Sequence, residues 1–573
     1  MARPPASPRA LAVARGDEPA DLLITGGRVA SPTTGEWIDT PLAVADGMVV
    51  SWEGLDAVEV VDVDGAALTP GFLDAHMHLE STKLWIDEFV RAVLPHGTTA
   101  VAADPHEIAN VFGVGGVAAL AQAAARMPFT FGICASSCVP ASPFESPGAE
   151  VGPAGVQDLL DDVGAIGVAE VMNYPGVIAG DPDLRAKIAA AGHRRVDGHA
   201  PGLTGGPLDA YLAAGVESDH ECTSLAEAEE KRRKGMWVFI RQGSASQNLL
   251  ELIPTVVAHG TSRVALCTDD REPDTLLSIG HINDCIRMAV ANGVSELDAI
   301  ALATVNTAEY HNFHHLGLLA PGYQADVVCF DALASWAPSR VWQRGRLVAA
   351  DGRMLPGVVP DAPAPTWMHG SVHVASNLSA GDLTVARPAG GRAKVITVTA
   401  RSLTTASTVA DVDDPEVDLA RIGVVERHRD TGRIGLGYVS GFGLSRGAIA
   451  TTVAHDAHNC MVVGSRADAG PPDMAAAVAR LAEIGGGQVA MLDGRLLAEV
   501  RLPIGGLMST GHAPDVAEDL RTLTAAAAGE LGVTLEAPFM QLSFLGLSVI
   551  PELRITDLGL VDVTAFALTS LAP

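Results

Sequence analysis

Charged residues are scarce in this sequence, and basic ones scarcest, which excludes one broad class of partner. Of 573 residues only 18% are charged, and 38 Lys and Arg stand against 68 Asp and Glu, a formal net charge of −30. A surface of this sign repels the phosphate backbone of nucleic acids. We therefore expect no nucleic-acid partner, whereas the acidic balance favours solubility and bound cations.

Long hydrophobic runs are also missing. The longest, residues 111–125, has 15 residues and contains a Gln, whereas a membrane-spanning helix needs about 18 or more apolar residues. The N-terminus, MARPPASPRALAVARGD, has arginines and prolines but no sustained apolar segment, so it does not resemble a secretory signal. We expect no membrane association, and a mobile leader over residues 1–20.

Cysteines are few and odd in number. The seven are scattered through apolar segments, and only Cys134 and Cys138 are close, so no second pair completes a zinc ribbon. This pattern favours reduced, buried thiols in a cytoplasm. Internal repeats are not apparent, and no Lys-Ser/Thr follows Gly485–Gly487 to make a phosphate loop.

The chain is long enough for two or three domains, and its middle predicts an α/β barrel. Alternating strands and helices indicate right-handed βαβ units, and eight strands predict a closed (β/α)8 TIM-type barrel over residues 66–325. The expected strands are 69–78, 98–107, 130–140, 165–173, 195–200, 215–222, 236–242 and 263–270; the helix-like segments between them include 83–94, 110–126, 181–193, 224–233 and 246–258.

Two further domains are expected around the barrel. Residues 21–65 form short strands with turns, and strand character returns over 326–360, so the two segments predict one small split β domain. The proline-rich hinge LPGVVPDAPAPTW precedes residues 366–573, which are numerous enough for an additional C-terminal α+β domain.

Metal-binding side chains recur at the predicted strand ends. His76 and His78 are two apart on a strand and point to one side, so both can bind one ion. Such a pair alone often arises by chance, but four more ligand types follow later strands, namely Glu170, His199, His220 and Asp269. Barrel enzymes place their chemistry at this face, and a buried lone His or carboxylate is costly unless paired or metal-bound.

Four imidazoles and two carboxylates suit two divalent ions better than one. Glu170 can bridge them with one oxygen to each, and the ions lower the pKa of a shared water towards neutrality. Asp269 would bind one ion and accept and return a proton. The ligand set fits Zn, Mn or Fe without choosing among them.

Several long motifs resemble one known family, the bacterial adenine deaminases of the amidohydrolase superfamily. They include PGFLDAHMHLES, RAVLPHGTTAVAADPHEIANVFG, AEVMNYPGVI, GHAPGL, SDHE, CTDD, DTLLSIGHIND and GAIATTVAHDAHN, and the resemblance runs from about residue 22 to the end. It implies a binuclear manganese or iron centre, with zinc as the alternative, in a cytoplasmic homo-oligomer. The C-terminal region would be the family's C-terminal domain.

The resemblance also implies a reaction. Adenine and water would give hypoxanthine and ammonia, a step of purine salvage in which a small purine base is the partner. A hydroxide bridging the metals would attack C6 of the base while N1 is protonated. Asp269 would pass the proton to the departing amine, Glu170 would hold both ions, and His220 would act as ligand or electrostatic helper.

The sequence departs from the family pattern at several positions. Lys83 stands where Met is expected, and Glu272 where His often precedes the Pro. Gln242 and Gln247 lie in IRQGSASQN, where the family usually has IREGSAAKN. All six ligand positions match, so the departures concern substrate contacts or helix surfaces rather than catalytic competence.

Six further residues are candidate substrate contacts, each with a structural alternative: Glu80, His106, Glu107, Asn173, His455 and His458. The cluster around His106 and Glu107 either lines the purine pocket, with Glu107 a donor to N1, or packs the barrel rim. Glu80 either contacts substrate or orients a ligand. The polar run 455–459 is either a loop over the barrel mouth or a buried turn network.

Other polar residues are expected to be structural. Asp270 points away from Asp269 on a strand and would have a structural or capping role. We expect His281 at a helix start to be a surface or capping residue, and His311, His314 and His315 to form a surface cluster.

Three other functions compete with adenine deamination. A cyclic-amide hydrolase of the same superfamily, such as a dihydroorotase or hydantoinase, usually bridges its metals with a carbamylated lysine, and the fourth strand here has Glu170 and no Lys. A deaminase of a modified or different purine would differ only in its pocket. A catalytically inactive scaffold would have lost ligands, and none is missing.

Overall fold

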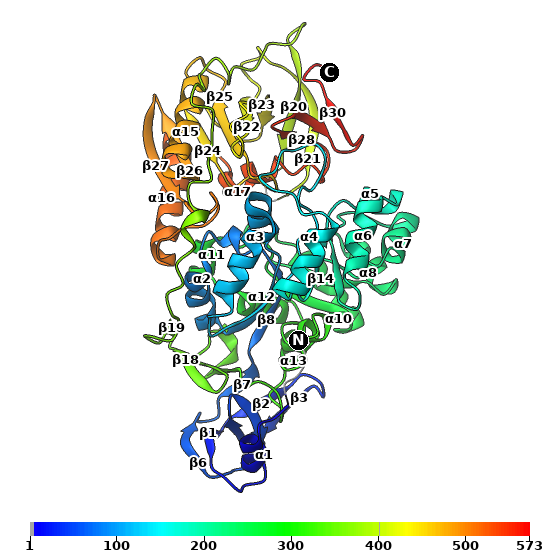
Figure 1. Ribbon diagram of the computed structural model, residues 1–573, viewed down its shortest axis with the longest axis vertical. Coiled ribbons are helices and arrows are strands. Elements are labelled where there is room, and N and C mark those ends of the chain that lie inside the picture. Colours follow the sequence, from blue (N-terminus) through cyan, green and yellow to red (C-terminus); the bar gives the residue numbers. More distant parts are fainter. Residues whose placement is uncertain (1–4, 400–401) are drawn as a thin grey trace.

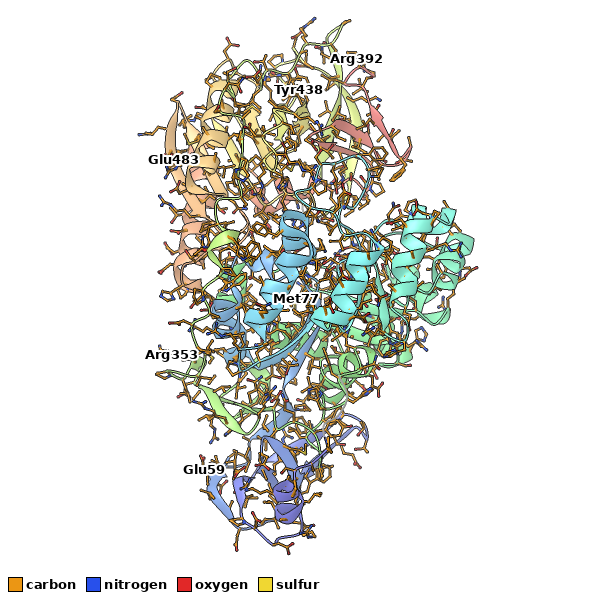
Figure 2. The ribbon with its side chains drawn as sticks, viewed as in Figure 1. Glu59, Met77, Arg353, Arg392, Tyr438 and Glu483 are labelled. Carbon is orange, nitrogen blue, oxygen red and sulfur yellow. The ribbon has the colours of Figure 1, made fainter. Side chains whose placement is uncertain are left out.

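The structure is a computed structural model that describes residues 5–399 and 402–573. It is a mixed α/β protein with three regions along its long axis (Figure 1). In Figure 2, Glu59 marks the N-terminal β region at one end, Met77 the central strand–helix region, and Tyr438 and Arg392 the C-terminal region at the other end.

Residues 5–20 are ordered, where the sequence predicts a mobile leader; residues 1–4 lie outside the described part of the chain. Helix α1, Pro8–Ala14, begins where the Ser7 side chain accepts from Ala10 N, and proline occupies its first position. Ala10 is buried, and Arg9 pairs with Asp21 at 2.5 Å. The segment therefore packs onto the first sheet.

Two sheets make up the N-terminal β region. A four-stranded sheet has the order β5-β4-β1-β6, and a seven-stranded sheet the order β19-β18-β17-β16-β7-β2-β3. Because β16 pairs with β7 and β7 with β2, segments almost 300 residues apart share one sheet. The strands are β1 Ala20–Thr25, β2 Arg28–Ser31, β3 Glu36–Asp39, β4 Leu42–Ala45, β5 Met48–Ser51, β6 Ala57–Asp62, β7 Ala67–Pro70, β16 Val327–Phe330, β17 Arg340–Gln343, β18 Arg346–Ala350 and β19 Arg353–Met354.

The strand–helix region has eight strands, β8 to β15, whose ladders with one another are parallel. They lie in three sheets, β10-β9-β8, β11-β12 and β13-β14-β15. Parallel bridges Ala135↔Val168 and Met77↔Asp269 join β10 to β11 and β8 to β15, and Glu217 N donates to Val196 O between β12 and β13. The strands are β8 Phe72–Met77, β9 Thr98–Ala103, β10 Thr130–Ile133, β11 Gly167–Val171, β12 Arg195–Gly198, β13 Ser218–Asp219, β14 Trp237–Arg241 and β15 Val264–Cys267.

These strands are shorter than the sequence predicts. The predicted strand 69–78 divides between β7 and β8, so Ala67–Pro70 belongs to the seven-stranded sheet rather than to the strand–helix region. The predicted strand 98–107 ends at Ala103, and His106 begins helix α3. The candidate site is built from polar residues at the ends of these strands and in the turns that follow them.

Helices cover the outside of this strand set (Figure 1). They are α2 Ile86–Val93, α3 His106–Ala124, α4 Pro153–Asp158, α5 Tyr174–Ala179, α6 Pro182–Ala190, α7 Gly205–Ala213, α8 Leu225–Arg233, α9 Leu249–Leu252, α10 Pro254–His259, α11 Pro273–Ser278, α12 Ile282–Ala291, α13 Glu296–Leu302 and α14 Val305–Tyr310. By length and composition α3 alone among the described helices could cross a membrane, but 61% of it is buried inside the fold. A core helix of a soluble protein passes the same test.

The C-terminal region is an eight-stranded sheet packed against helices. Its order is β21-β20-β23-β22-β25-β24-β26-β27, and a three-stranded sheet β28-β29-β30 lies beside it. The elements are β20 Arg392–Val398, β21 Thr405–Asp411, β22 Ala420–Val425, β23 Ile434–Ser440, β24 Ala448–Thr451, β25 Cys460–Ser465, α15 Gly470–Ile484, β26 Gly487–Leu492, β27 Arg495–Arg501, α16 Ala513–Leu531, α17 Pro538–Phe544, β28 Leu553–Thr556, β29 Gly559–Asp562 and β30 Ala567–Thr569.

An apolar cluster joins the C-terminal region to the carboxyl ends of the central strands. Cys138, Met172 and Ala245 come from the strand–helix region, and Met540 and Phe544 come from α17. All five side chains are buried. Burial of this surface from water holds the two regions together and fixes what lies above the strand ends.

Candidate active site

The six predicted metal ligands converge at the carboxyl ends of β8, β11, β12, β13 and β15. His76 ends β8 beside Asp269, whose backbone N donates to His76 O at 3.0 Å. The Nε2 atoms of His76 and His78 lie 3.3 Å apart. His78 directs its Nδ1 to Asp104 O at 3.0 Å, which turns Nε2 into the site. All six side chains are buried.

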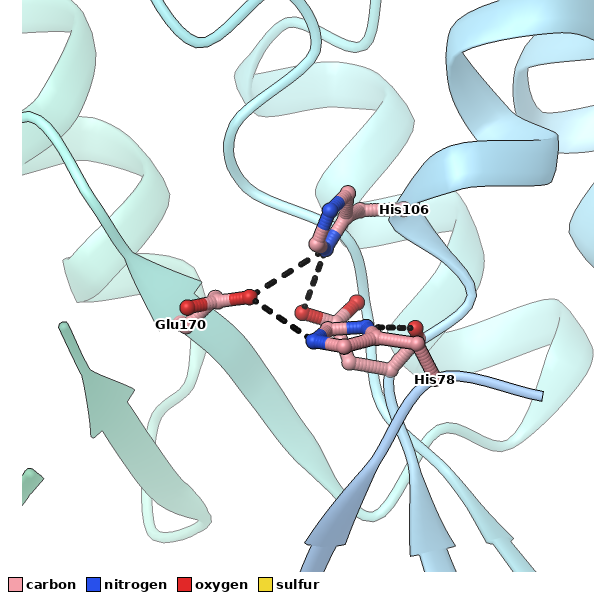
Figure 3. A group of neighbouring side chains, drawn as sticks. His78, His106 and Glu170 are labelled. Atoms are coloured by element: carbon pink, nitrogen blue, oxygen red, sulfur yellow. Dashed lines mark hydrogen bonds and ion pairs between the residues drawn. The ribbon is translucent and has the colours of Figure 1, made fainter. Parts of the chain in front are cut away.

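Glu170 lies between two pairs of histidines and directs one oxygen to each pair. Its Oε1 is 3.4 Å from His78 Nε2 and 3.9 Å from His76 Nε2. Its Oε2 is 2.6 Å from His199 Nδ1 and 3.3 Å from His220 Nε2. Figure 3 shows the Oε1 side, where Glu170 reaches from β11 towards His78 and His106. Each oxygen of the Glu170 carboxylate therefore faces a different pair of imidazoles.

Asp269 closes the site opposite Glu170. Its Oδ1 is 3.1 Å from His78 Nε2, and its backbone is left-handed, with φ 57°, a conformation uncommon outside glycine. Burial alone would raise the pKa of the Asp269 carboxyl, but the charge of Arg241 and the hydrogen bond with His78 hold it well below its usual range. Asp269 is therefore ionised at neutral pH.

Arg241, which is absent from the residues predicted from sequence, pairs with Asp269 from the end of β14. Its Nη1 lies 2.6 Å from Asp269 Oδ2, and the same guanidinium hydrogen-bonds Glu221. Arg241 is only 2% exposed. The sequence signal that could have identified Arg241 is its place at the end of the apolar run MWVFI. A charge that ends a buried strand needs a partner of opposite charge.

Replacing Arg241 by Met should destabilise the protein strongly. Glu221 and Asp269 would be left as uncompensated buried charges, which costs about 3–5 kcal/mol of unfolding free energy. A shift of the urea midpoint measures this. Arg387→Met removes an exposed pair with Asp413 and should shift the midpoint little. Equal midpoints for the two variants would contradict the argument.

Two candidate substrate contacts, His106 and Glu107, start helix α3 beside the ligands. His106 Nδ1 is 3.0 Å from Asp104 Oδ2 and 3.3 Å from Glu170 Oε1. Glu107 Oε1 accepts from Ser81 Oγ at 3.1 Å, while its Oε2 has no hydrogen-bond partner among the described residues. Burial and the neighbouring Glu80 raise the pKa of Glu107 well above its ordinary value. A carboxyl held in its acid form can donate a proton.

The C-terminal region forms a roof over this cluster. His455 Nδ1 lies 3.3 Å from Glu107 Oε1, and the His455 ring stacks on Phe544 with centroids 4.4 Å apart and planes 6° from parallel. Asp456 Oδ1 lies 3.6 Å from His106 Nε2. Of the two interpretations of residues 455–459, the loop over the strand ends agrees with these contacts.

A small cavity remains between the ligands and the roof. The floor and one wall are His78, His106, Glu170, His199, His220, Glu221, Asp269 and Asp270, and the cover is Met172, Leu403, His455, Asp456, Phe544, Leu547 and Ile550. One side is therefore polar and metal-binding in type, and the other is largely apolar. A lining that is polar on one side and flat and apolar on the other is typical of sites for small planar molecules with polar edges.

Comparison with known proteins identifies the family to which the chain belongs. Residues 67–354 match the model of the amidohydrolase family, and residues 395–567 match that of the adenine deaminase C-terminal domain. An adenine deaminase of Desulfatibacillum aliphaticivorans is 44% identical over 98% of this chain and 99% of its own. The chain belongs to the adenine deaminase family. An adenine deaminase of Methanothrix thermoacetophila is 42% identical over 97% of this chain and 98% of its own.

Not every candidate of the adenine deaminase pattern lies in the cavity. Asn173 caps helix α5, where its Oδ1 accepts from Gly176 N at 2.9 Å, so the structure gives it a capping role instead of the predicted substrate contact. His458 is buried behind the roof, and its Nδ1 accepts from Ala454 N at 3.1 Å. Glu80 accepts from Ile108 N at 2.9 Å. None of these three lines the cavity, and Glu107 does not line it either but lies behind His455, whose Nδ1 is 3.3 Å from Glu107 Oε1.

Two histidines expected at the surface are buried instead. The His281 side chain does not cap its helix: Nδ1 lies 2.9 Å from Thr98 Oγ1 and Nε2 3.2 Å from Asp74 Oδ2. His311 Nε2 donates to Ala75 O at 2.7 Å. His314 is exposed and His315 half-buried, so only part of the expected surface cluster exists.

Two departures from the adenine deaminase pattern lie against each other. Lys83 Nζ donates to Glu272 Oε1 at 2.7 Å, and both residues are buried. Neither lines the cavity, and Lys83 is not on a helix surface as the sequence suggests. The departures therefore form one compensated ion pair outside the site.

Proposed function

We propose that the protein hydrolyses adenine to hypoxanthine and ammonia with two divalent cations held by His76, His78, Glu170, His199, His220 and Asp269. The observation that supports this assignment is Glu170, whose two oxygens face two different histidine pairs. Manganese or iron is proposed, with zinc as the alternative, because imidazole and carboxylate ligands suit all three.

The residues present fit two metal ions. Groups of ligand atoms within 4.8 Å of one another include His76, Glu170 and His220, and His76, His78 and Asp269. Buried polar atoms such as these are expensive to desolvate without a partner. Bound ions would lower the pKa of a water to supply a nucleophile at neutral pH and would polarise the reacting carbon.

The protein's own side chains would position the base and move protons. Asp269, kept ionised by Arg241, would accept a proton and return it to the departing amine. Glu107, whose pKa is raised by burial, would protonate N1. His220 Nε2, 3.3 Å from Glu170, would act as a ligand and electrostatic helper. The roof would exclude bulk water from the cavity.

Adenine should be the preferred substrate in a panel of purines assayed for ammonia release. Protein reconstituted with Mn, Fe or Zn should convert adenine to hypoxanthine, and adenosine should be a poor substrate because the roof residues leave no opening for a ribose on N9. Turnover of another purine in preference to adenine would instead assign a modified-purine deaminase. Ammonia release from adenosine or cytosine but not from adenine would refute the assignment.

A cyclic-amide hydrolase is not proposed, since the bridging place is occupied by Glu170. This leaves adenine deamination as the proposed reaction.

We also propose the domain organisation. Strands β8 to β15 would close into a (β/α)8 barrel over residues 66–325, flanked by a split β domain of 21–65 with 326–360 and a C-terminal domain of 366–573. The parallel bridge Met77↔Asp269 between the first and last strands supports closure.

Location and assembly are proposed on other grounds. The seven cysteines are all unpaired and buried, which supports a reducing cytoplasm. The edge strand β6 exposes Val58 and Val60 at 79% and 61%, and an exposed apolar edge favours pairing with another chain. We therefore propose a homo-oligomer.

A further inference from the structure

Within residues 5–399 and 402–573, Asp456 is the one acidic residue of the roof that lines the cavity, and its carboxylate has no hydrogen-bond partner there. It is 1% exposed, and neither carboxylate oxygen has a hydrogen-bond partner among the described residues. Its nearest imidazole nitrogens, His106 Nε2 and His455 Nδ1, lie 3.6 and 3.8 Å from Oδ1. Both distances exceed those of a hydrogen bond.

The other buried carboxylates around the site keep at least one hydrogen bond, because Glu80 and Glu107 each lack a partner on one oxygen only. Glu145 is also buried, yet its Oε1 accepts from Ala141 N at 2.9 Å and its Oε2 from Ser548 Oγ at 3.1 Å. Leaving a buried carboxylate without a donor costs several kcal/mol. Because Asp456 borders the cavity and Glu145 does not, the missing donor belongs to whatever fills the cavity.

The position of Asp456 indicates which group of a bound molecule would donate the hydrogen bond. His106 spans the wall between the two ends, with Nδ1 3.3 Å from Glu170 and Nε2 3.6 Å from Asp456. Asp456 and the candidate ligand Glu170 are therefore separated by about the width of the His106 ring, with Asp456 at the end remote from the ligands. In a purine whose amine-bearing carbon C6 faces the ligands, N9 of the five-membered ring lies at the far edge of the base, and in the free base N9 carries an N–H.

We propose that Asp456 accepts a hydrogen bond from the N–H of the five-membered ring of the bound purine and thereby selects free bases over N9-substituted purines. The inference rests on the proposed function. The stacked His455 and Phe544 rings provide the flat cover that holds a planar base in this orientation. A site built around a substrate N–H discriminates strongly against analogues that lack it.

The test compares adenine with 9-methyladenine, which lacks the N–H, in wild-type protein, Asp456→Ala and Glu145→Gln. Losing a hydrogen bond to a charged acceptor should lower kcat/KM for adenine by about 10- to 150-fold in Asp456→Ala. The 9-methyladenine value should stay within about threefold or rise, so the preference collapses. Glu145→Gln should keep the wild-type preference.

Purine and 9-methylpurine carry no amine to lose, so they bind without being converted. The ratio of their inhibition constants measures the preference for the N–H without turnover. Asp456→Asn serves if the alanine variant does not fold, and its neutral oxygen should lower the ratio less. Equal losses for both ligands would assign Asp456 a structural role and overturn the inference. Three ions per wild-type chain and two in Asp456→Ala would also overturn it, by placing a cation there. Wild-type protein inactive on adenine would refute the proposed function itself.

Discussion

Glu170→Gln is expected to reduce the divalent metal content of the purified protein from about two ions per chain to one or fewer. A glutamine amide offers one acceptor oxygen, so it cannot face both histidine pairs as the Glu170 carboxylate does. Deaminase activity should fall by more than about 100-fold, because even residues that only orient metal ligands contribute about 10- to 100-fold and Glu170 would be a direct ligand. Metal analysis beside an ammonia-release assay measures both effects.

A matched control for this substitution is Glu145→Gln. Glu145 is a buried carboxyl outside the ligand set, so its amide variant should keep the metal content. His76→Ala provides a second route to metal loss and should also remove at least one ion. One tightly bound ion in fully active wild-type protein would contradict the binuclear proposal.

Asp269→Asn should lower kcat by about 100- to 10,000-fold, the effect of losing a well-placed general base. The amide keeps the shape and one metal-binding oxygen, so part of the metal should remain. Because the pKa of Asp269 is held well below its usual range, the wild-type carboxylate stays ionised throughout the neutral range. Activity of the wild type should therefore not decline through protonation of Asp269 until the solution is strongly acidic.

Single-turnover rates and metal analysis on the same preparation separate the two roles of Asp269. Asp274→Asn changes a half-buried carboxylate on helix α11 outside the cavity and serves as the control. A variant of Asp269 within about tenfold of the wild type would assign the proton transfer elsewhere. Glu107, whose Oε2 accepts no hydrogen bond from the described residues, is then the next candidate.

The six candidate ligands can be predicted because each lies within two residues of the carboxyl end of a short strand. Parallel strands bring their carboxyl ends to one face, so order along the chain is enough to place His199 and Asp269 together. The strands themselves are predicted too long, because the polar residues that follow them continue the same composition into turns. Thus the pattern favours one strand over 98–107, whereas His106 starts a helix.

What sequence could not predict depends on partners far along the chain. His281 is buried because Thr98 and Asp74, more than 180 residues away, surround its ring. The pairing of Arg241 with Asp269 is likewise set by neighbouring strand ends. Asp456 lines the cavity only because an apolar cluster docks the C-terminal region onto the strand ends.

At two positions the sequence contains a helix-capping signal, but another feature of the same residues favours a different prediction. Ser7 followed by Pro8 is a helix start, although prolines near an N-terminus also suggest mobility. Asn173 before Tyr-Pro is an N-cap, although its closeness to Glu170 suggests a substrate contact. In both cases a short-range hydrogen bond decides the structure.

The ion pair of Lys83 with Glu272 restricts how these two positions can change during evolution. Replacing either residue alone would leave the other as a buried, uncompensated charge, at a cost of about 3–5 kcal/mol. A methionine and a histidine at these positions, the pair expected from the family resemblance, would be a second solution that needs no buried ion pair. An unstable single-substitution intermediate separates the two solutions. The double substitution Lys83→Met with Glu272→His would therefore be tolerated better than either half, and related sequences should be found in one state or the other rather than between them.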